Sequence, residues 1–502
     1  MPSVSQAVLL SWSVPPVATF ALALTALVYL RGWVLMRRAG VPFLPPWRAV
    51  SFLLGLLSLW IALASPVDTF DGFLLTAHML QHMILMMLAP PLILLGAPLL
   101  PLVRGLPVFA AREFAGPFLN WPVACRVGNA LTQPAVALLL MGGVMFAWHT
   151  PRLYELALAS SSWHQVEHAC FFIVSLIFWW PVAQPWPSRS RWPRWAMVPY
   201  LLLADLQNTT LSAILVFSDK VIYPSYERVP RLFGLSALHD QAAAGAMMWV
   251  LGSLPFAIPA VVIAIQCVQG RRLISSPSRG PESAPLDALV SFSQRLSFAG
   301  RFLRRRLSAG SVEAISFLVL FAVTGLFLAH LASASSDDDD LVQRLHENSG
   351  PFTVTVFAPA GELDAGPSDF NVLVQDSETQ QSLLDSKVEI LAQQKNAVRP
   401  TEAVQTTTDS ENKLLQTASL DLPAAGEWIV SIAVARGAQH VELSLPVSVA
   451  KSESGFSIPW SYVVLLVISV VLLCTYIRRH GTGRREVAEK PVGERGSAAT
   501  LP

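Results

Sequence analysis

Long apolar segments restrict the fold of this chain more than any other feature of its sequence. Nine of them have spanning length, which is about 20 residues for a helix in a bilayer. They fall near residues 14–35, 49–66, 73–95, 134–150, 163–184, 196–217, 239–268, 312–332 and 458–477. With 53% hydrophobic and 14% charged residues, the composition is typical of a polytopic membrane protein and unlike that of a soluble enzyme. We predict an all-α membrane protein of about nine transmembrane helices, with a seven-helix core in residues 1–270.

Basic residues between the apolar segments predict how the helices are oriented. Arginine is concentrated in alternate loops, above all in the loop at 271–310. Because such loops remain cytoplasmic, the N-terminus is expected outside and the tail at 478–502 inside. The loop at 271–310 is either an amphipathic helix on the inner leaflet or a solvated linker. The first apolar run precedes its basic residues, which favours a transmembrane helix over a signal peptide.

Residues 350–450 have a different pattern from the rest of the chain. About seven short segments alternate apolar and polar residues and are separated by Gly, Pro, Asp and Asn. This pattern is typical of an immunoglobulin-like β-sandwich. The predicted topology places it outside the membrane, between helices at 311–332 and 458–477. It contains no methionine, and we expect it to have a structural or docking role.

The segment at 76–98 carries the first group of candidate ligands. His78 and His82 lie four residues apart, so they share one face of a helix, and Met79 and Met83 lie in the same turns. Ionisable residues in a bilayer are costly, and two in register indicate a function. Imidazole with thioether suits copper as Cu(I), whereas imidazole alone suits zinc or haem. Histidines packed among ordinary core methionines are the alternative.

The predicted topology brings six histidines on four helices to the outer side of the membrane. These histidines are His78, His82, His149, His164, His168 and His239. Glu155, Glu167 and Asp240 are close enough in sequence to orient metal ligands. Asp205 lies inside the sixth apolar segment and is either a proton or ion group or a helix–helix contact. We predict a metal or haem site here, in preference to a set of interfacial polar anchors.

Other patterns in the sequence limit the chemistry. His164-Gln-Val-Glu167-His168 matches the inverted zinc-peptidase motif HxxEH. Three fixed positions in five residues are a weak signal, and we interpret the match as chance and expect no enzymatic activity. The four cysteines are far apart, which gives no thiolate metal site. A net charge of +1 gives no reason to expect nucleic acid as a partner.

Five blocks of this sequence resemble the CtaG-like family of cytochrome c oxidase assembly proteins, whose multi-pass core would cover about residues 14–270. The blocks are HMLQHMILMMLAPPLILLGAP, WHTPRLYELAL, HQVEHACFFIVSLIFWWPV, IYPSYERV and GLSALHDQAAAGAMMWVLG. The resemblance implies a bacterial inner-membrane protein that helps to deliver or insert copper, with oxidase subunits and copper chaperones as partners. The chain departs from the simplest family members after about residue 310. Its β-region faintly resembles the YtkA-like domains found near copper-handling membrane proteins.

Three functions are compatible with these residues, and the first is favoured. An assembly factor would hold Cu(I) at the histidines and neighbouring methionines. A copper importer would use the same outer site and an inward path past Met86, Met87 and Asp205. A haem-binding electron carrier would need only two facing histidines.

Overall fold

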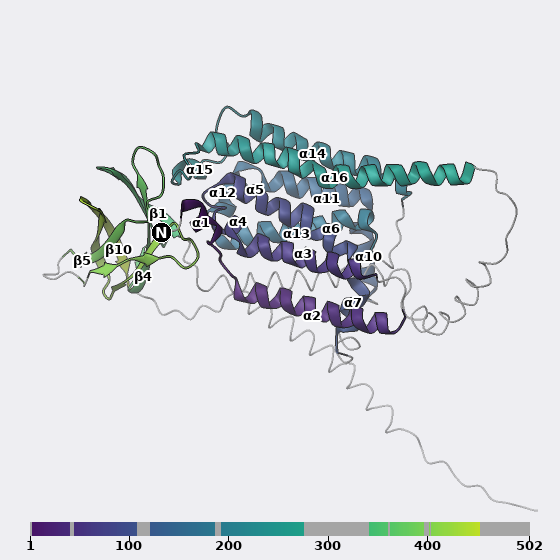
Figure 1. Ribbon diagram of the computed structural model, residues 1–502, viewed down its shortest axis with the longest axis horizontal. Helices are drawn as coiled ribbons and strands as arrows, with labels where there is room; N and C mark the ends of the chain where they lie inside the picture. The colour runs from purple at the N-terminus through teal and green to yellow at the C-terminus, as the bar shows by residue number, and fades with distance from the viewer. Residues whose placement is uncertain are drawn as a thin grey trace, which may run out of the picture.

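The computed structural model describes residues 3–40, 45–107, 121–185, 192–275, 341–359, 362–395, 401 and 403–451. The predicted helices near 312–332 and 458–477 lie outside these residues, as do the tail at 478–502 and all but the start of the loop at 271–310. The described helices form an elongated bundle, and the strands gather at one end of it (Figure 1).

The helices follow the predicted apolar segments. Six described helical spans are long and apolar enough to cross a membrane, and one bent pair would make a seventh. The spans are Pro16–Arg38, Pro46–Thr69, Leu75–Leu95, Ser161–Ala183, Arg194–Phe217 and Ala237–Gln269, and the bent pair is Cys125–Leu131 with Pro134–Trp148. These helices indicate a multi-pass membrane protein with a helical core. The total of nine spans stays a prediction.

Proline sets where many helices begin. It occupies the first position of α2 (Pro16–Arg38), α3 (Pro46–Ala64), α4 (Pro66–Thr69), α10 (Pro122–Leu131), α11 (Pro134–Trp148) and α12 (Pro151–Leu158). The first turn of a helix has no intrahelical acceptor for its N–H groups, so the missing N–H of proline costs nothing there. The remaining helices are α1 (Val4–Leu9), α5 (Leu75–Met83), α6 (Ala89–Leu95), α7 (Leu99–Gly105), α13 (Ser161–Ala183), α14 (Met197–Phe217), α15 (Ser225–Arg228) and α16 (Ala237–Ser275).

The third span is interrupted by a π-helical segment, η1 (Ile84–Leu88), between α5 and α6. Pro90 lies in α6, four residues after Met86, and has no N–H to donate to the Met86 carbonyl. The indole N–H of Trp179 on α13 donates to that carbonyl instead, at 2.9 Å. The backbone oxygen is therefore satisfied inside the apolar interior. Segments of this kind often adjoin functional sites, and this one begins two residues after His82.

We expect Trp179→Phe to lower the free energy of unfolding by about 1–3 kcal/mol, because it leaves the Met86 carbonyl buried without a donor. Thermal unfolding in detergent would measure this as a lower midpoint. Trp163→Phe is the matched control, since Trp163 is on the same helix but 45% exposed. Equal losses in the two variants would contradict the role given to the Trp179 indole.

The β-region consists of two five-stranded sheets, ordered β1-β2-β4-β8-β7 and β3-β10-β9-β5-β6. The strands are β1 (Leu341–Ser349), β2 (Phe352–Pro359), β3 (Leu363–Asp364), β4 (Gly366–Asp376), β5 (Lys387–Gln394), β6 (Val404–Gln405), β7 (Thr407–Thr408), β8 (Gln416–Leu422), β9 (Gly426–Arg436) and β10 (Gln439–Ala450). Val354 and Val372 of one sheet share a buried core with Ile390 and Ile432 of the other. The immunoglobulin-like arrangement of these sheets stays a prediction.

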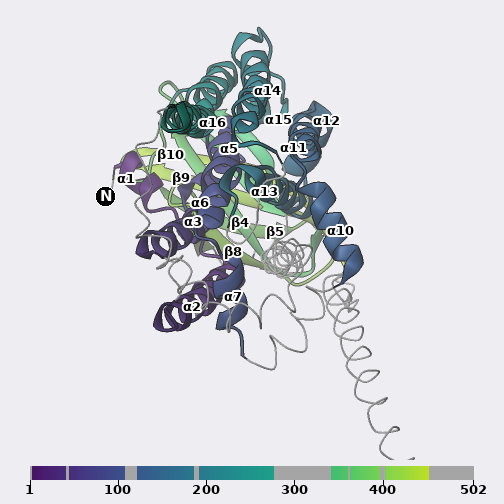
Figure 2. The ribbon, with the colours of Figure 1, turned by 90° about the vertical axis from the view of Figure 1, so that its right-hand side faces the viewer.

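The β-region packs against the end of the bundle where α4, α12 and α15 lie (Figure 1). In the view along the bundle from its other end, the strands lie behind the helices (Figure 2). An apolar cluster joins Phe70 and Phe73, in the loop between α4 and α5, to Phe357 of the β-region. The rings of Phe73 and Phe357 meet edge to face, with centroids 5.7 Å apart. The backbone N–H of Lys413 also donates to Ser11 Oγ at 3.0 Å. These contacts place the β-region beside the first turn of α5.

Candidate metal centre

The two pairs of histidines predicted to be candidate ligands converge on one point. His78 and His82 come from α5, and His164 and His168 from α13. One ring nitrogen from each lies within 4.8 Å of the others. The centroids of the rings are 4.3 Å apart for His78 and His82, 4.1 Å for His164 and His168, and 5.0 Å for His78 and His164. We call this group the four-histidine centre.

Helix geometry explains the convergence. Residues four apart lie one above the other on a helix, so each pair presents two imidazoles from a single face. The start of α5 is held by a residue far away in the sequence: Asp240 on α16 accepts hydrogen bonds from the backbone N–H groups of Leu75 and Thr76, at 2.6 and 3.2 Å. A carboxylate at this position accepts hydrogen bonds from the free N–H groups, and its negative charge interacts favourably with the positive end of the helix dipole. Asp240 therefore fixes the helix that carries His78 and His82.

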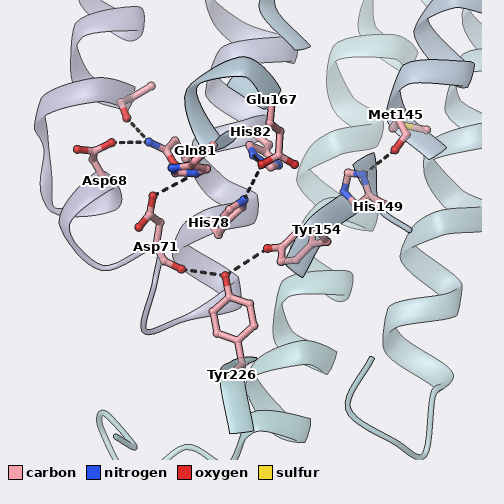
Figure 3. A network of polar contacts seen from close by, with 12 residues as sticks. Asp68, Asp71, His78, Gln81, His82, Met145, His149, Tyr154, Glu167 and Tyr226 are labelled. Atoms are coloured by element: carbon pink, nitrogen blue, oxygen red, sulfur yellow. Dashed lines mark hydrogen bonds and ion pairs between the residues drawn. The ribbon is translucent and has the colours of Figure 1, made fainter. Parts of the chain in front are cut away.

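Glu167 places a carboxylate against the centre. Its Oε2 lies 3.7 Å from Nε2 of His78 and 3.9 Å from Nε2 of His82, and its side chain is fully buried (Figure 3). Neither carboxylate oxygen has a hydrogen-bond partner among the described residues. A buried carboxylate is costly unless a positive charge or donors compensate it. A cation between Glu167 and the histidines would supply that compensation.

The ring nitrogens also fit a metal. Both nitrogens of His78 and both of His82 are buried and have no hydrogen-bond partner among the described residues. Most buried polar atoms in native proteins are paired, so unpaired nitrogens that face one another call for a ligand. Several imidazoles with one carboxylate suit a first-row transition ion such as copper, zinc or iron. The donor set alone does not choose among these metals.

His149 lies beside the centre at the end of α11. Its Nδ1 is 2.8 Å from the Met145 carbonyl, so Nδ1 carries the proton and Nε2 keeps its lone pair. Burial lowers the pKa of His149, which keeps the imidazole neutral. Its ring centroid is 6.2 Å from that of His82. His149 is thus a neighbour of the four-histidine centre with its tautomer already fixed.

Two residues that we did not single out from the sequence also contact the centre. The ring of Tyr154 on α12 lies 5.0 Å from the ring of His78, and its hydroxyl is 3.2 Å from that of Tyr226. Asp71 Oδ2 lies 3.5 Å from Nε2 of His164. Tyr154 is five residues after His149 in the block WHTPRLYELAL, and Asp71 is seven residues before His78. Closeness in sequence to His149 and His78 is the only signal that could have made Tyr154 and Asp71 candidates. No periodic pattern of residues points to them.

The environment of the centre shifts the pKa of ionisable groups outside the membrane spans. Burial raises the pKa of Tyr154 and of Tyr226, so both phenols remain protonated donors. Burial and the nearby Asp68 carboxylate raise the pKa of Asp71, while the 17% exposure of its side chain lets water stabilise the charged carboxylate. A cation bound beside Asp71 would act in the opposite direction and favour the carboxylate.

Several of the predicted site residues lie elsewhere. His239 is exposed at the start of α16. Glu155 accepts a hydrogen bond from the backbone N–H of Ser225, at 3.1 Å, and so links α12 to α15. Asp205 on α14 is partly buried, and its Oδ1 has no hydrogen-bond partner among the described residues. A metal or ion role for these residues stays a prediction.

The two predicted methionine ligands belong to the apolar core around the centre. Met79 is fully buried, and Met83 is partly buried and packs against the same core. Both lie on α5, in the turns that carry His78 and His82. Their role as thioether ligands also stays a prediction.

Comparisons with known proteins agree with the resemblance seen in the sequence. The family model described as "Cytochrome c oxidase caa3 assembly factor (Caa3_CtaG)" matches residues 27–270. An uncharacterized protein of Mycobacterium leprae (strain TN) is 27% identical over 263 residues, which are 52% of this chain and 40% of that protein. An uncharacterized protein of Mycobacterium bovis is 26% identical over 290 residues, 55% of this chain and 42% of that protein.

The match is thus partial on both sides. The chain spans about two fifths of the length of these curated relatives. No solved structure matches it. The matched part contains all four histidines of the centre and Glu167. The helical part of this chain, residues 27–270, therefore matches the family of cytochrome c oxidase caa3 assembly factors, Caa3_CtaG.

Proposed function

We propose that this protein takes part in cytochrome c oxidase assembly by binding copper at the four-histidine centre and passing it on. One observation carries the proposal: four imidazole nitrogens meet within 4.8 Å, in a family of oxidase assembly factors. The metal is cargo, so the centre must both hold it and release it. Oxidase subunits and copper chaperones are the proposed partners.

The residues of the centre have distinct tasks in this proposal. The histidines supply imidazole ligands, and Glu167 offsets the positive charge of the ion. Burial keeps bulk water from competing for the ligand positions. Met79 and Met83 lie in the same turns of α5 and, as soft thioether donors, favour Cu(I).

The arginine-rich loops support an outer location for the centre. They are expected to remain cytoplasmic, which places the N-terminus and the start of α5 on the outer face of a bacterial inner membrane. In this orientation the β-region also lies outside, because it packs against the same end of the bundle.

A haem centre fits the geometry less well. Two histidines can ligate haem iron from opposite sides of the porphyrin. Here four ring nitrogens crowd within 4.8 Å, so the other two imidazoles would occupy the plane that the porphyrin needs. A visible absorption spectrum without haem bands is the expected result.

Metal analysis tests the proposal directly. Protein purified in detergent from copper-supplied cells should contain about one copper per chain, held by the imidazole ligands. The double variant His164→Ala/His168→Ala should lose that copper. His239→Ala is the control and should retain it, because His239 is exposed and not a member of the four-histidine centre.

Other results would change the assignment. Iron in place of copper would favour a haem centre. Zinc would favour the zinc-peptidase interpretation of the HxxEH motif over a chance match. A wild-type protein without any of these metals would contradict a metal-handling role.

A further inference from the structure

We propose that Asp71 and His164 form the port through which a metal cation enters and leaves the four-histidine centre. This inference rests on the proposed function and adds the route by which the cargo is exchanged. Asp71 lies in the loop between α4 and α5, and His164 lies in the first turn of α13.

Exposure to solvent distinguishes the port from the interior of the centre. The side chains of His164 and Asp71 are 20% and 17% exposed. Those of His78 and Glu167 are fully buried, and that of His82 is 4% exposed. Nε2 of His164 is itself buried, so a cation arriving from water meets the Asp71 side chain first and His164 Nε2 next, before it can reach the inner ligands.

Distances make a stepwise transfer possible. Asp71 Oδ2 and His164 Nε2 are 3.5 Å apart, so one ion can contact both groups. The ring of His164 is in turn 5.0 Å from that of His78 and 4.1 Å from that of His168. An ion held at the port needs to move by only about one ring spacing to gain the inner imidazoles. The carboxylate attracts the hydrated cation, and the imidazoles replace its water.

The surrounding structure holds Asp71 in this position. The hydroxyl of Tyr226 donates to the Asp71 carbonyl at 2.8 Å. On either side of Asp71, Phe70 and Phe73 pack into the apolar cluster that includes Phe357 of the β-region. The β-region thus supports the loop whose carboxylate forms the port.

Asp68 provides a matched comparison in the same segment. Its Oδ1 accepts a hydrogen bond from Gln81 Nε2 at 2.7 Å, and its Oδ2 accepts one from the Ser13 hydroxyl at 3.0 Å. Both oxygens are therefore engaged, one in a contact with α5 and the other in a contact with the segment between α1 and α2. Asp68 carries the same type of side chain as Asp71, and its oxygens accept hydrogen bonds from the neutral side chains of Gln81 and Ser13.

The experiment is copper loading of the full chain in detergent, followed by stopped-flow with a coloured copper chelator as donor and then as acceptor. Asp71→Asn should slow loading about tenfold or more, as expected for loss of electrostatic steering. Because Asp71 also lies 3.5 Å from Nε2 of His164, equilibrium binding should weaken as well, but the slower loading is the effect that the port requires. Added salt should slow loading of the wild-type protein and have less effect on Asp71→Asn. Asp68→Asn should load and unload close to the wild-type rate.

Each possible outcome bears on the proposal. An unchanged loading rate in Asp71→Asn would mean that copper enters elsewhere. Weaker equilibrium binding with an unchanged loading rate would make Asp71 a ligand of the final site and would overturn the port. A wild-type protein that binds no copper would overturn the proposed function itself, before any variant is compared.

Discussion

The double variant His78→Ala/His82→Ala is expected to lose its copper and its ability to support cytochrome c oxidase activity. It removes two of the four imidazoles and both contacts that Glu167 makes with the centre. Changing residues that only orient metal ligands typically costs 10–100-fold in affinity, so losing two direct ligands should cost more than about 100-fold. Copper content by elemental analysis and oxidase activity in membranes measure the two effects.

The variant should nevertheless fold and reach the membrane. The histidines are buried with unpaired ring nitrogens, so their removal takes away a polar cost as well as packing contacts. Immunoblotting of membranes should show a wild-type amount of protein. His239→Ala controls for loss of a histidine outside the centre and should retain copper and activity. Full oxidase activity in the double variant, with normal copper content, would contradict the proposed site.

The sequence was sufficient to find the four histidines because the spacing within each pair is local. A separation of four residues on an apolar helix fixes a shared face, whatever the rest of the fold. This reasoning identified both pairs, and membrane depth then brought the pairs together. The predicted membrane depth also selected His149, whose ring lies 6.2 Å from that of His82.

Membrane depth alone does not settle which way a side chain points. His239 and Asp240 are at nearly the same depth on α16, but successive residues on a helix point about 100° apart. Asp240 consequently faces the start of α5 and caps it, whereas His239 is exposed. The sequence predicted a role for Asp240 in orienting metal ligands, and in the structure it acts on the backbone of the helix that carries two of them.

The residues that the sequence did not reveal are those brought in by long-range packing. Asp71 meets His164 across 93 positions of the chain, and Tyr154 meets His78 across 76. No periodicity links such residues, because their contacts depend on how the loop between α4 and α5 packs against α12 and α13. The apolar segments predict helices well, but they do not predict how one helix end is placed against another.

Glu167→Gln is the second substitution with a large expected effect, and its two effects have opposite signs. Without metal, the variant should unfold at a higher temperature than the wild-type protein. The Glu167 carboxylate is fully buried, and neither of its oxygens has a hydrogen-bond partner among the described residues. Replacing an uncompensated buried charge by a neutral group of the same shape is expected to stabilise the protein by about 1–3 kcal/mol.

Copper should remove most or all of this stability advantage. Loss of the carboxylate is expected to weaken copper binding by about 10–100-fold. At a free copper concentration 1,000 times the wild-type dissociation constant, binding stabilises the wild-type protein by about 4 kcal/mol. For a 100-fold weaker variant the same concentration gives about 1.4 kcal/mol. The difference, about 2.7 kcal/mol, is enough to offset most or all of the advantage of the metal-free variant.

Thermal unfolding with and without copper measures both effects on the same samples. Glu155→Gln is the matched control, because Glu155 is bonded to Ser225 and lies outside the four-histidine centre. It should lower the unfolding temperature by the same amount in either condition. A metal-free Glu167→Gln variant that is less stable than the wild-type protein would show that the carboxyl group is already compensated in the resting protein. Glu167 would then have a structural role, and the cost of burying its charge could no longer be an argument for a bound cation.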